Sequence, residues 1–118
     1  ALGDRYSGVI SNRSELSCLA VGAGSESGER IAAFPFDEDY EEDLESGIAD
    51  IKQCTLEGGA DHIHAARFLN RFIENNVPWL HTDLSSSNRK GGLGAALSEV
   101  NGFGVGFGIQ VLKKVLQK

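Results

Sequence analysis

Residues Pro78–Gly94, PWLHTDLSSSNRKGGLG, contain the only tryptophan of the chain, an alternating run of side chains and a polar loop that ends in glycines. Successive side chains of a β-strand point to opposite faces. That alternation places on one face Trp79, His81 and Asp83, and on the other Leu80, Thr82 and Leu84. One apolar face and one face bearing Trp, His and Asp predict a central strand whose end opens into a site or an interface.

A helical pattern lies directly before this strand. Apolar residues recur there at the spacing of one helix face, namely Ala65, Ala66, Leu69, Phe72 and Ile73. Asp61 follows two glycines and stands where a helix N-cap would, and Pro78 closes the segment. Helix, short loop and strand form the repeating element of an α/β layer, so the sequence predicts an α/β fold.

The first third of the chain predicts a second unit of the same kind. Tyr6–Ser11 has the apolar centre of a short strand, and Asn12 has the spacing of an N-cap before an apolar stripe that runs to Ala23. A series of glycines that ends at Gly28 is predicted to stop this helix. Ile31–Phe36 is apolar but contains a proline, which favours an edge strand or a loop.

The segment Asp37–Ser46 is strongly acidic and carries seven of the 17 acidic residues. It predicts a helix in which Tyr40 and Leu44, one turn apart, face the protein, and acids in its first turn suit the helix dipole. The acidic groups fit either a cation site or basic-partner surface, or a solvated helix face. The second interpretation is favoured because runs of charge usually face water.

Two weaker patterns complete the chain, which shows no internal repeat and no linker. Ile48–Cys54 predicts a strand around Ile51, and Ile109, Leu112 and Leu116 predict a terminal amphipathic helix. Residues 1–118 are therefore predicted to form a single unit.

Composition limits the classes of function. With 41% hydrophobic and 24% charged residues, the chain is ordinary for a globular protein. Its net charge of −6 argues against nucleic acid and against an anionic membrane as partners. Cys18 and Cys54 show neither a disulfide framework nor zinc spacing, which predicts a reducing compartment. No signal peptide or membrane-spanning run is visible, and the absence of Met before Ala1 predicts a fragment or a processed form.

Histidines and acids are the first candidates for chemistry, because zinc or manganese could use them. His62 and His64 project about 200° apart on a helix, so they are not expected to chelate one ion together. His81 and Asp83 point the same way on the predicted strand. A hydrogen-bonded structural pair is favoured there over a metal site.

Other catalytic arrangements are disfavoured. Ser85, Ser86 and Ser87 follow the His-x-Asp pair, but a triad within one strand and its loop is too local, and there is no Gly-x-Ser-x-Gly elbow. Lys90–Gly94 places its lysine on the wrong side of the glycines for a Walker A loop. Tight turns and close packing explain these glycines, and neither cysteine has a base beside it.

An ordered set of short motifs runs through the chain: Ala1-Leu2-Gly3, Ser27-Gly28-Glu29-Arg30, Gly59-Ala60, Ala65-Ala66-Arg67-Phe68-Leu69, Trp79-Leu80-His81-Thr82-Asp83 and Gly102-Phe103-Gly104-Val105. In this order the motifs resemble the C-terminal portion of the leucyl (cytosol) aminopeptidase family, the M17 metallopeptidases. The resemblance covers essentially the whole chain. It implies a three-layer αβα-type sheet with covering helices, here as a C-terminal fragment of the catalytic domain.

The resemblance also implies what the parent protein does. M17 enzymes are hexameric, cytoplasmic exopeptidases that remove N-terminal residues, often Leu, from peptides, using two divalent ions (Mn, Zn or Mg). Their metal ligands and catalytic groups lie upstream of the matched region, in and around a block that reads Asn-Thr-Asp-Ala-Glu-Gly-Arg. That block does not occur here. No catalytic residue, metal ligand or bound metal is therefore expected in this chain, which alone is expected to be inactive.

The resemblance implies that this chain contributes the supporting scaffold and part of the wall of the substrate pocket. The Gly58–Asp61 turn resembles the family loop that helps line the pocket for the N-terminal side chain, so Gly59, Ala60 and Asp61 are the predicted pocket residues. Small apolar residues usually follow in the family, whereas this chain has an Asp-His-Ile-His run that ends at His64. A charged rim bearing imidazoles could alter peptide preference, but a trait with no catalytic meaning is favoured.

Two other functions stay open. A non-catalytic α/β module would use the same scaffold for oligomerisation or partner binding. A stand-alone metal protein would hold an ion through His81 and Asp83.

Overall fold

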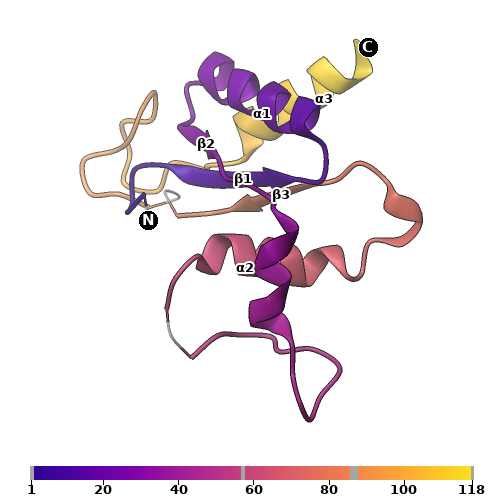
Figure 1. The fold of residues 1–118 in the computed structure, drawn as a ribbon. Coiled ribbons are helices and arrows are strands. Elements are labelled where there is room, and N and C mark those ends of the chain that lie inside the picture. The colour runs from indigo at the N-terminus through magenta and orange to yellow at the C-terminus, as the bar shows by residue number, and fades with distance from the viewer. Residues whose placement is uncertain (1, 57, 86–87, 118) are drawn as a thin grey trace.

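The computed structural model describes residues 2–56, 58–85 and 88–117. Its elements in chain order are β1 (Ser7–Ser11), α1 (Ser14–Ser27), β2 (Ile31–Ala33), the 3₁₀ helix η1 (Glu38–Leu44), α2 (Asp61–Asn70), the 3₁₀ turn η2 (Glu74–Asn76), β3 (Leu80–Asp83) and α3 (Val105–Leu116). Figure 1 shows three layers, with α1 and α3 on one side of the sheet and α2 with η1 on the other. The predicted three-layer α/β class is confirmed.

The sheet has the strand order β2-β1-β3. β1 runs parallel to β2, with Ser7 opposite Ile31, and antiparallel to β3, with Ile10 opposite His81. The prediction that the tryptophan-containing strand is central is therefore wrong for this sheet, because β3 lies at its edge. β1 takes the central place, and all five of its residues are buried since helices cover both faces.

The face of the sheet under α1 and α3 is packed by small and apolar residues. Val9 contacts a cluster whose buried members are Ala20, Ala23, Ile31 and Phe107. α1 approaches β2 so closely that a Cβ atom on Gly24 would lie 2.7 Å from the Cγ1 atom of Ile31. Only glycine fits that contact without a shift of the neighbours.

The opposite face is formed around Ile10, the neighbour of Val9, because adjacent strand residues point to opposite sides. Ile10, Ile63 and Ala66 are its buried core, and Trp79 packs against them. The indole Nε1 of Trp79 donates a hydrogen bond to the side chain of Asn70 at 2.9 Å. The predicted split of the Trp79–Leu84 strand is confirmed here, since Leu80 packs on the other cluster.

Helix boundaries differ from the sequence pattern in identifiable ways. Asn12 does not cap α1, because its side chain binds the segment before β3 instead. The Nδ2 atom of Asn12 donates to the Val77 carbonyl at 2.9 Å, and Oδ1 accepts the backbone amide of Trp79 at 3.0 Å. The helix therefore begins at Ser14, and its glycines are tolerated until Gly28, which adopts a left-handed conformation with φ of 77°. α2 ends at Asn70, before the predicted Phe72 and Ile73.

The acidic segment forms the 3₁₀ helix η1 rather than an α-helix, although Leu44 is buried and Tyr40 packs inward as predicted. The predicted strand Ile48–Cys54 is wrong. This segment belongs to a long loop, and Ile48 is 102% exposed. Within the described ranges, no helix is long and apolar enough to cross a membrane.

Candidate functional site

The predicted pocket turn lies at the start of α2. Ala60 occupies the N-cap position with a left-handed backbone (φ 52°, ψ 25°), and its carbonyl accepts the amides of Ile63 and His64 at 2.9 and 3.0 Å. Asp61 is the first helical residue, so the predicted N-cap is displaced by one position. A left-handed alanine is uncommon, and the turn aims the residues before α2 toward the surface.

One cavity beside this turn brings the three predicted residues together. Its volume is about 300 Å³, and its lining consists of Phe34, Gly59, Ala60, Asp61, His62 and Ile63. We call it the α2 cavity. Phe34 follows β2, so the wall combines a residue beside the sheet with the first turn of α2.

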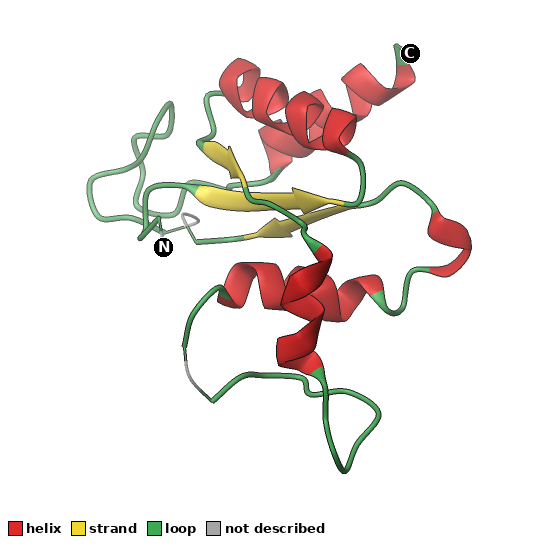
Figure 2. Cartoon of the chain, viewed as in Figure 1, coloured by secondary structure: helices red, strands yellow, loops and turns green. Residues whose placement is uncertain are grey.

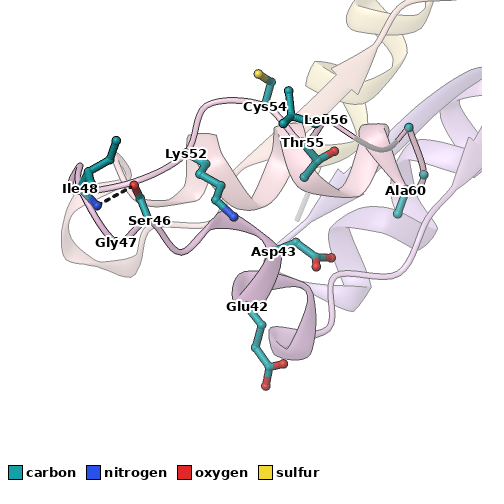
Figure 3. A pocket seen from close by; sticks show the side chains of 12 residues that line it. Glu42, Asp43, Ser46, Gly47, Ile48, Lys52, Cys54, Thr55, Leu56 and Ala60 are labelled. Carbon is teal, nitrogen blue, oxygen red and sulfur yellow. Dashed lines mark hydrogen bonds between the residues drawn. The ribbon is translucent and has the colours of Figure 1, made fainter.

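A larger hollow of about 1060 Å³ adjoins the same turn and shares Gly59 and Ala60 with the α2 cavity. Figure 3 shows it between the end of η1 and the loop that leads to α2, with the side chains of Asp43, Lys52 and Thr55 around it. It is a broad, open surface of mixed charge.

His62 is fixed at the rim of the α2 cavity by two contacts. Its Nδ1 atom lies 2.5 Å from Oδ2 of Asp83, and its ring stacks on Phe34 with centroids 5.3 Å apart and planes 9° apart. Asp83 therefore pairs with His62 on α2 and not with its strand neighbour His81. The predicted His81–Asp83 hydrogen bond is wrong because Asp83 reaches across the layer.

His81 lies behind this pair. Its Nε2 atom is buried and has no hydrogen-bond partner among the described residues. Burial lowers the pKa of His81 below its ordinary value of 6.5; Asp83 opposes that shift in part, and His62 adds to it. The result is a neutral imidazole at neutral pH.

His64 points to a different partner from His62, as its helical position predicts. Its Nε2 atom lies 2.8 Å from Oδ2 of Asp43 on η1. Two arginines also pair with η1. The Nη2 atoms of Arg67, within α2, and of Arg71, at its C-terminal end, each lie 2.9 Å from a carboxylate oxygen of Glu41. Sequence reasoning missed these pairs. The predicted solvated acidic face is wrong for Glu41, whose side chain is 24% exposed, whereas that of Asp43 is 57% exposed. The available signal was the i, i+4 spacing of the two arginines.

The residues present do not fit the metal centre that the family resemblance implies. In the described part of the chain, no three His, Cys, Asp or Glu side chains are grouped so that they could hold a metal ion. Ser85 donates a hydrogen bond to the Tyr6 carbonyl at 2.6 Å, while Ser86 and Ser87 lie outside the described residues. Cys18 and Cys54 are free thiols at the surface.

Comparison with known proteins places this three-layer fold in a family of peptidases. The model of the cytosol aminopeptidase family, catalytic domain (M17 peptidases), matches residues 1–112. The chain belongs to the cytosol aminopeptidase family.

Individual relatives agree with this assignment. A probable cytosol aminopeptidase of Ehrlichia ruminantium (strain Gardel) is 44% identical over 87 residues, 72% of this chain and 17% of that protein. The corresponding protein of Wolbachia pipientis wMel is 37% identical over 123 residues, covering 100% of this chain and 23% of its own length. The chain thus spans about a fifth of the length of these curated relatives.

Solved structures share the fold. The bottromycin maturation enzyme BotP superposes with a TM-score of 0.90 at 28% identity, over 100% of this chain and 26% of that one. A mutant of tomato leucine aminopeptidase superposes with a TM-score of 0.83 at 27% identity, over 96% of this chain and 21% of that one.

Proposed function

We propose that this chain supplies scaffold and part of the substrate-pocket wall of a two-metal leucyl aminopeptidase that removes N-terminal amino acids from peptides. The observation that carries the proposal is the family match over residues 1–112. Gly59, Ala60 and Asp61 are the proposed pocket residues, and their shared cavity supports that role. The two divalent ions, Mn, Zn or Mg, would be held by polypeptide outside this chain, because the family resemblance places their ligands upstream of the matched region.

The proposal extends to assembly and location. Large apolar residues stand open on the surface, among them Ile48, Leu56 and Leu97, which are 102%, 101% and 92% exposed. Such residues fit burial against further polypeptide of the catalytic domain or against other subunits of a homo-hexamer. The relatives are named cytosol aminopeptidases, which supports a cytoplasmic location, and BotP has been solved in complex with Mn, which supports metal dependence.

Activity measurements on two proteins test this proposal. The 118-residue chain and the longest product of its natural reading frame are each assayed with leucine p-nitroanilide and Mn²⁺. Metal-dependent turnover is expected only from a longer product that contains the Asn-Thr-Asp-Ala-Glu-Gly-Arg block. Robust metal-dependent turnover by the 118-residue chain alone would overturn the proposed division of labour.

The second candidate is a non-catalytic α/β module that serves oligomerisation or partner binding. The exposed apolar residues that support assembly favour it equally. The reading frame upstream of Ala1 discriminates between the two. An in-frame Asn-Thr-Asp-Ala-Glu-Gly-Arg block favours the enzyme, whereas a start codon near Ala1 without that block favours the module.

A further inference from the structure

The α2 cavity has an apolar wall and a polar rim, which is the make-up of a small side-chain site. Phe34 and Ile63 supply the apolar part of the lining, and Ile63 is only 6% exposed. Asp61 and His62 supply the polar part, at the first turn of α2. A ligand group in this cavity would contact apolar side chains on one side and hydrogen-bonding atoms on the other.

The side chains of the rim offer hydrogen-bond acceptors, beside the backbone amides at the partially positive start of α2. Asp61 is exposed and forms no ion pair with a described residue, so its carboxylate is available to a ligand. The Nδ1 atom of His62 donates a hydrogen bond to the Asp83 carboxylate, because a carboxylate can only accept. In the neutral tautomer that keeps this hydrogen bond, the remaining nitrogen, Nε2, is an acceptor.

The charge around the cavity is negative. Asp61 contributes a carboxylate to the lining and Asp83 contributes one that contacts His62, while the imidazole of His81 is neutral at neutral pH because burial lowers its pKa. The arginines of the α2 segment, Arg67 and Arg71, pair instead with Glu41 on η1. A negative field with acceptor atoms selects a cationic donor.

We propose that the α2 cavity is a subsite for a basic side chain of a peptide, with the methylene stem against Phe34 and Ile63 and the charged head between the Asp61 carboxylate and Nε2 of His62. Long basic side chains bury their stems on apolar surface in this way. His62 would contact the ligand directly, and its ring is held in place by Asp83 and by its stack on Phe34. The inference rests on the proposed function, because it takes a peptide as the ligand and the cavity of the proposed pocket residues as its site.

Direct binding tests the subsite without any turnover. Arginine amide and leucine amide are titrated into the isotopically labelled 118-residue chain, and amide and imidazole resonances are followed by NMR. Both probes carry the same α-ammonium and carboxamide groups, so their difference isolates the guanidinium. Arginine amide is expected to shift the Ala60–Ile63 amides and the His62 ring saturably, and to bind more tightly than leucine amide.

Variants of Asp61 assign the effect to the charge. Asp61→Asn is expected to weaken arginine amide about two- to fivefold, the range of an exposed ion pair, and to leave leucine amide unchanged. Asp61→Glu keeps the charge and is expected to retain binding, which separates loss of charge from disturbance of the helix start. Glu74→Gln, an exposed charge change on η2, is the matched control and is expected to have no effect.

Three results would overturn the subsite: equal affinity for the two probes, unchanged arginine amide affinity in Asp61→Asn, or an equal loss in Glu74→Gln. The last would show a response to net charge alone. Failure of this test leaves the aminopeptidase proposal standing, because no hydrolysis is measured. An inactive longer product would likewise leave the binding result intact.

Discussion

The two faces of the sheet differ in the side chains that pack on them. Under α1 and α3 the contacts are made by alanine, glycine and aliphatic side chains around Val9, with Phe107 inserted from α3. Under α2 and η1 a small apolar core around Ile10 is surrounded by charged pairs, including His62–Asp83, His64–Asp43 and Arg67–Glu41. Figure 2 shows the two helical layers with β1 between them.

This difference separates stability from recognition. Close packing of small residues fixes the distance of α1 from the sheet, and the buried cluster between them consists of apolar side chains. Charged pairs on the α2 side are directional, and they place titratable groups around the two hollows beside Gly59. We therefore expect the largest losses of stability on the α1 side and the effects on ligand binding on the α2 side.

Phe107→Ala should give the largest loss. The side chain is 5% exposed within the α1–α3 cluster, and truncation of a buried Phe costs about 3–5 kcal/mol because it leaves a cavity. Urea denaturation measures the free energy of unfolding. Phe72→Ala, at a side chain that is 65% exposed, should change it by less than about 0.5 kcal/mol. Equal losses in the two variants would contradict the packing described for α3.

Arg67→Ala tests the charged face. Arg67 is 7% exposed, lies 2.9 Å from Glu41 and stacks its guanidinium 4.4 Å from the Phe36 ring centroid. Removing a buried hydrogen-bonded charge should lower the free energy of unfolding by about 1.5–3 kcal/mol. Arg71→Ala removes a more exposed partner of the same carboxylate and should cost about 0–1 kcal/mol. A larger effect at Arg71 would show that burial does not set the strength of this network.

Glu29→Ala tests a long-range helix cap on the α1 side. The carboxylate accepts the amides of Gly104 at 3.0 Å and Phe107 at 2.5 Å at the start of α3. Loss of such a cap costs about 0.5–2 kcal/mol. The control is Glu26→Ala, whose partner Lys114 lies in an exposed ion pair, and it should cost less. Thermal or urea unfolding measures both losses of stability. A larger loss in Glu26→Ala than in Glu29→Ala would contradict the cap.

His81 should give the smallest effect, and it depends on pH. The pKa of His81 in the folded protein lies below the ordinary 6.5 because of burial. As the pH falls below 6.5, the unfolded chain binds a proton that the folded chain does not, so stability falls with it. Unfolding at about pH 7.5 and about pH 5.5 should show a larger drop for the wild type than for His81→Gln. Equal drops would contradict a buried neutral imidazole.

Local patterns predicted the elements and the fold class because they depend on neighbours in sequence. The stripe through Ala65 and Ala66 became α2, and the alternation through Trp79 and Asp83 correctly divided the strand between two clusters. Ile48–Cys54 shows the limit of the same reasoning. An apolar run is compatible with a strand only where another strand is available to pair with it.

Contacts between distant segments were beyond the sequence. The order of the strands depends on how β3 returns beside β1, and the partner of Asp83 depends on where α2 packs. Glu29 is separated by 75 residues from the amide of Gly104 that it caps, so no local motif could reveal that bond. The Ser27–Arg30 motif contributed only to the family resemblance, and the structure shows the contact that its Glu29 makes.

The most direct test of the central claim is a metal titration. Mn²⁺ and Zn²⁺ are titrated separately into the purified 118-residue chain by calorimetry, and the ion content after dialysis is measured by mass spectrometry. We expect no stoichiometric pair of tightly bound ions, because the ion-holding groups are proposed to lie on other polypeptide. Two ions bound tightly per chain, and lost on His81→Ala, would contradict the claim.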